Sequence, residues 1–413
     1  MWFYWIMNSS KTKIITLLFA MLLAMTVLFA AACNTSDPVS DESESTVGEE
    51  TTSTPEETAA PEPVSLIPEG FDFRKTVSDY MRKMGLVEWK AKETADYSSE
   101  WDITKGLIYE GGKTYRGMPY ANQQCGFEIF AAHLDENNVY IGSTVFDDCY
   151  GNTCTTSIKN AWYLVSNTIN FRYAIDMFPY PDKDTGVLPL GNIPWGEYDG
   201  KNTSLSVKKK TDKTTVYEAY SLLQLGDAVV YYHDNNGHGR MVTGEVKTAR
   251  NADGTINGDR SFVTLTDQTS HFIKNSDSPL PTHWNVDRKF SFADLYVGGY
   301  LPVTIKELQE GKAEEPAFKI LNKPLAKTFT GSKTFRGTVE SNFKIILATS
   351  TLTDDSGNVL FTHTATPEGM SYDMTELNSL FDLKTLGAGS YTFSVKATIG
   401  FGEFEVYSLT FEL

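Results

Sequence analysis

A cysteine stands where a polar loop gives way to an amphipathic segment, in the stretch GNTCTTSIKNAW. Apolar residues follow Cys154 at offsets of four, seven, eight and eleven positions: Ile158, Ala161, Trp162 and Val165. This spacing defines one face of a helix. The same offsets after Cys149 begin with Thr153 and Thr156 and define no such face. Cys154 is therefore predicted to lie at the start of a helix.

A thiol at a helix start has chemical value. The positive end of the helix dipole and the unpaired N–H groups favour a thiolate over a thiol, so the pKa of a cysteine falls there. The same N–H groups are placed to stabilise the oxyanion of an acyl-transfer intermediate. These properties make Cys154 a candidate nucleophile.

A base for this thiol is expected from LLQLGDAVVYYHDNNGHGRMVTGEV, which has the pattern of a turn, a buried strand, a hairpin loop and a returning strand. His238 is predicted to begin the returning strand, and His233 to lie solvated in the loop. Histidine is the usual general base near neutral pH.

A third group should orient the imidazole. The next predicted strand, RSFVTLTDQTSHF, ends in three polar candidates. Asp267 is favoured because its carboxylate accepts a hydrogen bond from the ring and supports the imidazolium. His271 and Gln268 remain as alternatives.

These pieces, in this order, resemble the NlpC-type cysteine peptidases, which are papain-like bacterial enzymes that cut peptides of peptidoglycan. YRGMPYANQQ resembles the family's Gly-x-Pro-Tyr segment, GNTCTTSIKNAW its nucleophile helix, and LQLGDAVVYY with GHGRMVTG its strand pair. The match covers roughly residues 110 to 272, in patches. Thr153 and Thr155 flank the cysteine where the family usually has Asp and Ser.

The resemblance implies an acyl-transfer hydrolase with Cys154 as nucleophile, His238 as general base and Asp267 or His271 as third member. It also places Tyr120 in the cleft. The aromatic segment FPYPDKDTGVLPLGNIPWGEYDG is a candidate cleft wall or lid through Trp195 and Tyr198. No cofactor is needed, and no metal site is expected because the histidines lack paired spacing.

Two further functions use the same residues. A degenerate papain-like domain would make a non-catalytic surface-binding lipoprotein, an alternative motivated by the altered neighbours of Cys154. A transglutaminase-like or amide-ligating activity needs the same Cys and His. A disulfide between Cys149 and Cys154 would favour the non-catalytic function, so the pairing of Cys125, Cys149 and Cys154 helps to decide between the enzyme and the binding protein. Exported proteins usually pair their cysteines, but an odd number leaves at least one free.

The first 33 residues indicate export. Lys11 and Lys13 precede the apolar run IITLLFAMLLAMTVLFAAA, which stops at Cys33. This is the pattern of a signal peptide, and AAAC resembles a bacterial lipobox, which implies lipidation of Cys33. The expected location is the outer face of the bacterial cytoplasmic membrane. The alternative is that residues 14–32 stay as a membrane anchor.

Residues 34–67 are predicted to be a disordered acidic tether, since they hold Ser, Thr, Pro and Glu but no Lys or Arg. Much of the net charge of -17 lies here. The acidity and the lack of a basic patch argue against nucleic-acid binding. The expected partners are cell-wall peptides and, through Cys33, the membrane.

The remaining chain is long enough for two domains. Residues 68–308 are predicted to form an α+β domain, the papain-like NlpC-type domain of the resemblance, that begins with a helix whose apolar residues include Val77, Tyr80, Met81 and Met84. Residues 309–327 are charged and proline-punctuated, which indicates a linker. Residues 328–413 alternate apolar and polar residues between turn signals and predict an all-β sandwich, which resembles immunoglobulin-like modules.

Overall fold

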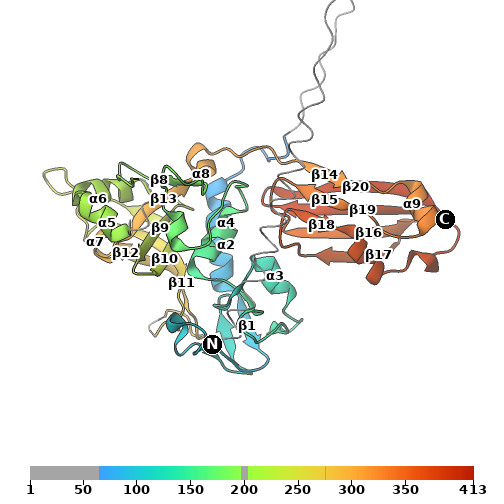
Figure 1. The fold of residues 1–413 in the computed structure, drawn as a ribbon, viewed down its shortest axis with the longest axis horizontal. Helices are drawn as coiled ribbons and strands as arrows, with labels where there is room; N and C mark the ends of the chain where they lie inside the picture. Colours follow the sequence, from blue (N-terminus) through green and yellow to red (C-terminus); the bar gives the residue numbers. More distant parts are fainter. Residues whose placement is uncertain (1–64, 197–202, 275) are drawn as a thin grey trace, which may run out of the picture. The chain divides into compact units, whose positions relative to one another are not determined.

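The computed structural model describes residues 65–196, 203–274 and 276–413 (Figure 1). They form a mixed α+β protein with several antiparallel sheets, which confirms the predicted α+β class. The described residues belong to one compact unit. The predicted signal peptide, Cys33 and residues 34–64 of the tether lie outside the described residues. Within the described ranges, no helix has the length and apolarity needed to cross a bilayer.

The first described helix, α2 (Phe73–Leu86), follows from its sequence pattern. Asp72 caps it by accepting a hydrogen bond from the Lys75 N–H at 2.9 Å. Its buried face contains Val77, Tyr80, Met81 and Met84, as the helical spacing predicts. This face packs against helix α4 (Cys154–Trp162) and strand β10 (Asn236–Lys247).

A six-stranded sheet carries the second half of this α+β region. Its strand order is β12-β11-β10-β9-β13-β8, and every neighbouring pair is antiparallel. Besides β10, the strands are β8 (Val187–Pro189), β9 (Ala228–His233), β11 (Phe262–Gln268), β12 (Trp284–Ser291) and β13 (Leu301–Ile305). Helix α4 lies against β10 and β11. The sheet and α4 together therefore bring distant parts of the sequence into contact.

Shorter elements complete this region. The strands are β1 (Glu88–Ala91), β2 (Ala95–Asp96), β3 (Ile108–Tyr109), β4 (Thr114–Arg116), β5 (Gln123–Gln124), β6 (Val139–Tyr140) and β7 (Tyr150–Gly151). The helices are η1 (Asp102–Thr104), α3 (Phe127–Ala132), η2 (Ala174–Met177), α5 (Ser204–Lys210), α6 (Lys213–Ser221), α7 (Phe292–Gly298) and α8 (Lys306–Glu310). Strands β4, β1 and β6 form a three-stranded sheet.

The hairpin of β9 and β10 is tighter than predicted. Asp234 and Asn235 both have positive φ, 50° and 60°, as a two-residue type I′ turn requires. His233 is therefore the last residue of β9 rather than a loop residue, and its ring pairs with Asp234 at 2.9 Å. His238 is the third residue of β10.

Strand β12 contains a bulge. Leu265 pairs with Arg288 and Asp267 with Asn285, so two residues of β12 face the single residue Thr266 of β11. Asp287 takes a positive φ of 54° there. Because side chains alternate between faces in a regular strand, the extra residue brings Asn285 and Arg288 to the same face.

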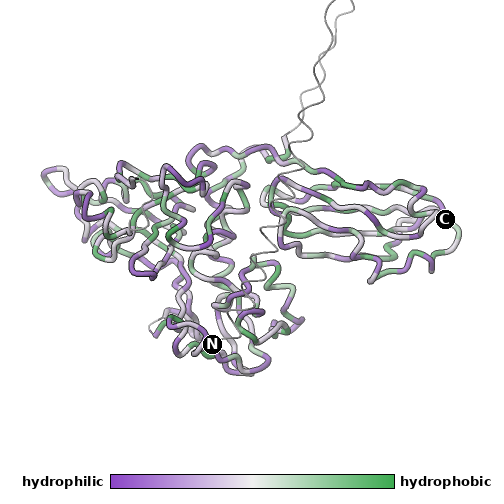
Figure 2. The backbone as a smooth tube through the Cα atoms, in the orientation of Figure 1, coloured by the Kyte–Doolittle hydropathy of each residue, from purple (hydrophilic) through white to green (hydrophobic). Residues whose placement is uncertain are grey.

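The C-terminal region consists of two antiparallel sheets over a core of its own. Apolar and polar residues alternate along its strands (Figure 2). One sheet contains β14 (Phe318–Leu321), β15 (Thr338–Ser341) and β18 (Ser371–Asp373); the other contains β16 (Leu347–Asp354), β17 (Val359–Ala365), β19 (Ser390–Ile399) and β20 (Gly402–Glu412). The remaining helices are α9 (Ala326–Ser332), η3 (Met374–Ser379) and η4 (Leu383–Thr385).

The predicted linker at 309–327 is partly structured. Strand β14 lies inside it and pairs with β15, from Phe318 opposite Ser341 to Leu321 opposite Thr338. Composition misled here because charged and proline residues flank a short strand whose Phe318 and Ile320 pack against the C-terminal core. The C-terminal sheets therefore begin about ten residues earlier than residue 328.

Candidate active site

Cys154 is the first residue of α4, as its helix face predicts. Thr153 is the N-cap, and its N–H donates to the Thr156 hydroxyl at 2.9 Å. The preceding residues are held by a close approach to another segment, because the Asn152 N–H donates to the Pro119 carbonyl at 3.0 Å. A Cβ at Gly151 would lie 2.3 Å from that same carbonyl oxygen. A glycine is therefore required next to the turn that presents the thiol.

His238 reaches the thiol because β10 lies close to α4. A Cβ at Gly239 would lie 2.7 Å from Ile158 Cδ1 of α4, and one at Gly237 would lie 2.5 Å from Ala174 Cβ. Gly239 therefore lets the strand approach α4, and Gly237 lets it approach η2 on the other side of His238. The Cys154 Sγ lies 3.9 Å from the Gly237 carbonyl oxygen.

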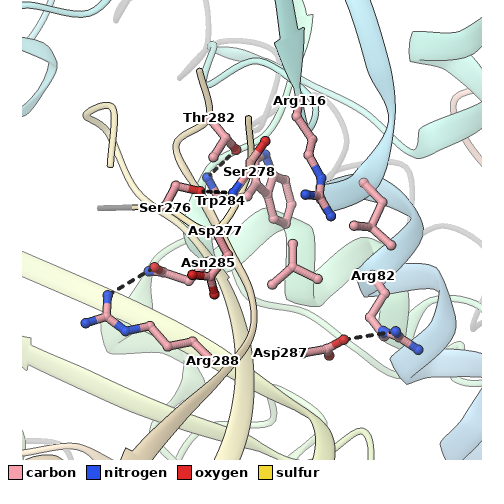
Figure 3. Close-up of a pocket in the computed structure, with 13 residues that line it drawn as sticks. Arg82, Arg116, Ser276, Asp277, Ser278, Thr282, Trp284, Asn285, Asp287 and Arg288 are labelled. Atoms are coloured by element: carbon pink, nitrogen blue, oxygen red, sulfur yellow. Dashed lines mark hydrogen bonds and ion pairs between the residues drawn. The ribbon is translucent and has the colours of Figure 1, made fainter. Parts of the chain in front are cut away.

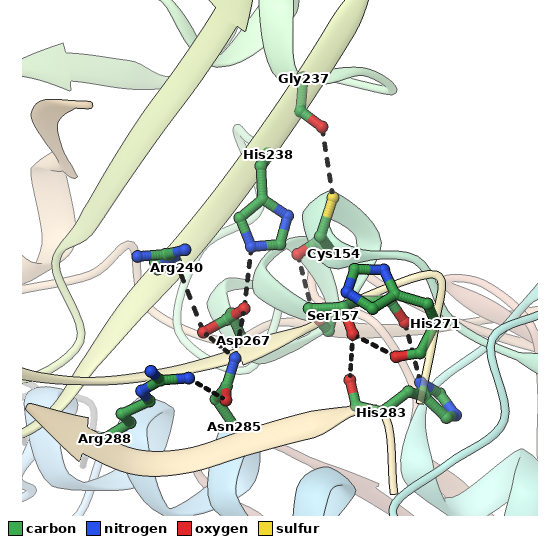
Figure 4. A network of polar contacts seen from close by, with 11 residues as sticks. Cys154, Ser157, Gly237, His238, Arg240, Asp267, His271, His283, Asn285 and Arg288 are labelled. Atoms are coloured by element: carbon green, nitrogen blue, oxygen red, sulfur yellow. Dashed lines mark hydrogen bonds and ion pairs between the residues drawn. The ribbon is translucent and has the colours of Figure 1, made fainter. Parts of the chain in front are cut away.

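Asp267 lies on β11 and is fully buried. Its Oδ2 is 2.9 Å from Nε2 of His238. Figure 4 shows the imidazole between this carboxylate and the thiol, with the other ring nitrogen toward Cys154. The structure thus brings Cys154, His238 and Asp267 together in the order that a thiol, a base and an orienting acid require.

The electrostatics of the three groups favour a thiolate and an imidazolium. Burial raises the pKa of the Cys154 thiol, but His238 and the Gly239 N–H outweigh it and hold that pKa below its usual range. Burial favours a neutral His238, yet Tyr300, Cys154 and Asp267 raise the pKa of the ring well above its usual value. An imidazolium beside the sulfur stabilises the nucleophilic form at neutral pH.

Asp267 stays ionised despite its burial. Burial raises its pKa, but His238 and Arg240 lower it below the usual range. The Asn285 amide donates to both carboxylate oxygens at 3.2 Å, and Arg240 Nε lies 3.7 Å from Oδ1. Arg240 itself lies between the rings of Phe290 and Tyr300, at 4.1 and 4.5 Å from their centroids.

The two alternative third members are not bonded to His238. The Gln268 amide donates to the Met118 carbonyl at 3.0 Å. His271 lies close enough to His283 to lower the pKa of that ring, and the His271 backbone carbonyl accepts from the Thr269 hydroxyl at 2.7 Å. Alternation along β11 explains the difference for Gln268, because adjacent residues of a strand face opposite sides.

Tyr120 lies beside the thiol and is buried. Burial and the nearby Cys154 raise the pKa of its phenol. The Tyr120 N–H donates to the Tyr109 hydroxyl at 2.8 Å, and that hydroxyl lies 2.7 Å from Nε2 of His283. Because Nδ1 of His283 contacts the Thr269 carbonyl at 3.1 Å, Nδ1 carries the proton and Nε2 accepts. Burial lowers the pKa of His283 to about 3, so the ring is neutral.

Trp101 is an aromatic residue of the site that the sequence did not single out. The residue is 38% exposed, which is unusual for tryptophan, and its indole meets the rings of Tyr120 and Phe146 edge-on, with centroids 6.4 and 4.7 Å away. It offers an apolar surface next to the residue that adjoins the thiol.

The two other aromatic candidates for the cleft are Trp195 and Tyr198. Trp195 is 5% exposed and packs against Phe178 at 5.0 Å, so its ring is covered by core side chains rather than presented to a ligand. Tyr198 lies outside the described residues.

Cys125, Cys149 and Cys154 are all free thiols in the structure. Burial raises the pKa of Cys149, and it raises that of Cys125 as well. Because all three thiols are free, neither a Cys149–Cys154 nor a Cys125–Cys149 disulfide is formed. Cys154 differs from the other two in having its pKa lowered.

Asn285, Arg240 and Tyr300 were missed by sequence reasoning. Asn285 lies directly opposite Asp267 in the pairing of β11 and β12. No local pattern in THWNVDRK marks this residue, because its role depends on strand register. Within the described ranges, no cluster of three or more His, Cys, Asp or Glu side chains is arranged to hold a metal ion.

Comparisons with known proteins give little. Neither the protein-family models nor the curated proteins yield a match. Among solved structures, the chain is similar to PorZ, described as an essential bacterial surface component of the type-IX secretion system of Porphyromonas gingivalis, with 12% identity and a TM-score of 0.15. The match covers 44% of this chain and 24% of PorZ, so it spans about a quarter of that protein. A TM-score this low carries no argument about fold or function.

Proposed function

We propose that this protein is an exported cysteine hydrolase that cleaves amide bonds in peptidoglycan peptides. The observation that carries the proposal is the placement of His238, whose Nε2 lies 2.9 Å from Asp267 Oδ2 while its other ring nitrogen faces the Cys154 thiol and lowers the pKa of that thiol (Figure 4). Free, buried thiols are common, but one whose pKa is lowered by a carboxylate-bonded histidine is typical of a nucleophile.

In the first half of the reaction, the Cys154 thiolate attacks the amide carbonyl carbon. The developing oxyanion receives hydrogen bonds from backbone N–H groups at the start of α4. The His238 imidazolium then gives its proton to the leaving nitrogen as the C–N bond breaks. The products of this half are a free amine and a thioester on Cys154, with a neutral imidazole.

In the second half, His238 takes a proton from a water molecule, which attacks the thioester carbonyl. The C–S bond breaks, the acid is released, and the thiolate and imidazolium are restored. Asp267 keeps its negative charge throughout and holds the ring, because Nε2 carries a hydrogen toward Oδ2 in both states.

The substrate class and location rest on the sequence. The three motifs around Tyr120, Cys154 and His238 resemble NlpC-type peptidases, and the proposed fold of 68–308 is papain-like. The exported, lipid-anchored state through Cys33 would place the enzyme at the outer face of the cytoplasmic membrane, near peptidoglycan. The C-terminal pair of sheets is proposed to be an immunoglobulin-like sandwich that targets or spaces the enzyme.

The decisive experiment uses purified protein and muropeptides, with new amine and acid termini as the readout. Cys154→Ala should abolish cleavage, and Cys125→Ala should retain it if its thermal melting is unchanged. Equal cleavage by Cys154→Ala and wild type would exclude Cys154 as nucleophile. Muropeptide binding without cleavage by the wild type would instead support the non-catalytic surface-binding function.

A further inference from the structure

A polar cavity of about 440 Å³ lies beside β12 (Figure 3). Its walls come from four segments: the last turn of α2, the end of β4, the first half of β12 and the residues just before that strand. The cavity contains three arginines and two aspartates: Arg82, Arg116, Arg288, Asp277 and Asp287. Its lining therefore has an excess of one positive charge.

One arginine and one aspartate neutralise each other. Arg82 Nη2 lies 2.9 Å from Asp287 Oδ2, while the other oxygen of Asp287 accepts from the Thr243 hydroxyl at 2.8 Å. Asp287 has both oxygens engaged. Arg82 keeps a buried Nε that has no hydrogen-bond partner in the described structure.

The other two arginines form no ion pair with the residues that the structure describes. Arg288 Nη1 donates to the neutral Asn285 side chain at 3.2 Å, and its guanidinium lies 5.3 Å from the Phe290 ring centroid. Arg116 is the last residue of β4, and its side chain extends toward Trp284 in Figure 3. The other acidic side chain of the lining is Asp277, whose carboxylate can offset one of these two positive charges.

The neutral groups of the lining also suit an anion. The Ser276 and Ser278 hydroxyls accept backbone N–H bonds at 3.1 Å from Ser278 and Leu280, which leaves both O–H groups able to donate. The C-terminal carbonyls of α2, which would repel an anion, are covered in part. The Met84 and Val87 carbonyls accept from Met118 and Gly117 at 2.9 and 2.7 Å.

We propose that this cavity is a binding site for a small anion, a carboxylate or a phosphate, held by the fork of Arg116, while Arg288 lies across the cavity and adds positive charge to its lining (Figure 3). A guanidinium presents two parallel N–H donors that match either group. The site is separate from the thiol, because Asn285 and Asp267 lie between Arg288 and His238 (Figure 4). It stands whether or not Cys154 is catalytic.

The test is calorimetric titration of the purified full-length protein with three probes: N-acetylalanine, its neutral amide, and inorganic phosphate. At least one of the two anions should bind saturably, and the amide should not. Arg116→Gln should weaken binding at least tenfold, and Arg116→Lys should also weaken it because the paired donors are lost. Arg260→Gln removes the same charge from an exposed residue outside the cavity and should leave binding unchanged.

Each outcome decides the proposal. Binding of N-acetylalanine alone identifies a carboxylate ligand, and binding of phosphate alone identifies a phosphate ligand. Saturable binding of neither anion overturns the proposal, and so does equal weakening by Arg116→Gln and Arg260→Gln. Thermal melting of each variant separates a lost site from a lost fold.

Discussion

The Asn285 side chain donates to both oxygens of Asp267, at 3.2 Å each, from the opposite position on the neighbouring strand. The amide nitrogen of Asn285 can only donate hydrogen bonds, so its contact with both oxygens favours the ionised form of Asp267, which only accepts them. It also fixes the plane of the carboxylate, whose Oδ2 then meets the His238 ring.

Asp267→Asn should therefore reduce kcat by about 10²- to 10⁴-fold, because the ring loses both its orientation and the charge that stabilises the imidazolium. The pKa of His238 should fall, and that of Cys154 should rise toward its usual value. The rate of alkylation of Cys154 against pH measures the second change. Asp253→Asn, on an exposed loop, is the matched control.

The pH dependence of kcat/KM should be bell-shaped. The pKa of Cys154 is lowered and that of His238 is raised, so the thiolate–imidazolium pair exists between the two values. Activity should fall in acid as the thiolate is protonated and in alkali as the imidazolium loses its proton. A profile that rises steadily through pH 8.5, the usual cysteine value, would contradict the pair.

Thiol labelling should be selective. Iodoacetamide at mildly acidic pH should modify Cys154 before the other two thiols, since burial raises the pKa of both Cys125 and Cys149. Peptide mapping by mass spectrometry identifies the labelled residue. Labelling of Cys149 first in folded protein would be inconsistent with the described structure.

Arg240 is expected to act as a positioning residue. Arg240→Gln removes a charge 3.7 Å from Asp267 and a side chain that fills the space between Phe290 and Tyr300. We expect kcat to fall about tenfold, which corresponds to an increase of about 1.4 kcal/mol in the activation free energy. We also expect the acid limb of the pH profile to shift to higher pH. Arg240→Lys should restore part of the charge effect, whereas a purely structural role would leave the pH profile in place.

Gly151→Ala should destabilise the fold by about 1–3 kcal/mol, a typical cost of overpacking. The added methyl would lie 2.3 Å from the Pro119 carbonyl oxygen, which cannot move alone because it accepts the Asn152 N–H. Chemical denaturation measures the loss. Gly331→Ala, where a Cβ meets nothing within 4 Å, is the control and should not be destabilising.

The elements of the site could be predicted where local pattern decides them. The apolar face after Cys154 located α4, and the alternation around His238 located β10. Asp267 is favoured over Gln268 and His271 for the chemistry of its carboxylate and not for its position, because strand alternation says that neighbours differ in face but not which face meets the histidine.

The supporting residues depend on pairing between distant segments. Asn285 and Arg240 contact Asp267 only because β12, β11 and β10 are adjacent and in a particular register. Neither residue has a distinctive spacing from Cys154 or His238. The prediction of a linker at 309–327 missed strand β14 for a different reason. This strand has only four residues, and the proline and charged residues around it indicate a loop.

The bulge of β12 makes the two proposed sites depend on the length of one strand. Arg288 lines the anion cavity and bonds to Asn285, which bonds to Asp267, only because β12 has one residue more than its partner. Inserting one residue into β11 after Thr266, opposite the bulge, would restore regular pairing and place Asn285 and Arg288, which are three residues apart, on opposite faces. A conservative exchange at Val286 leaves the register intact, so the site tolerates changes of side chain far better than a change of one codon in length.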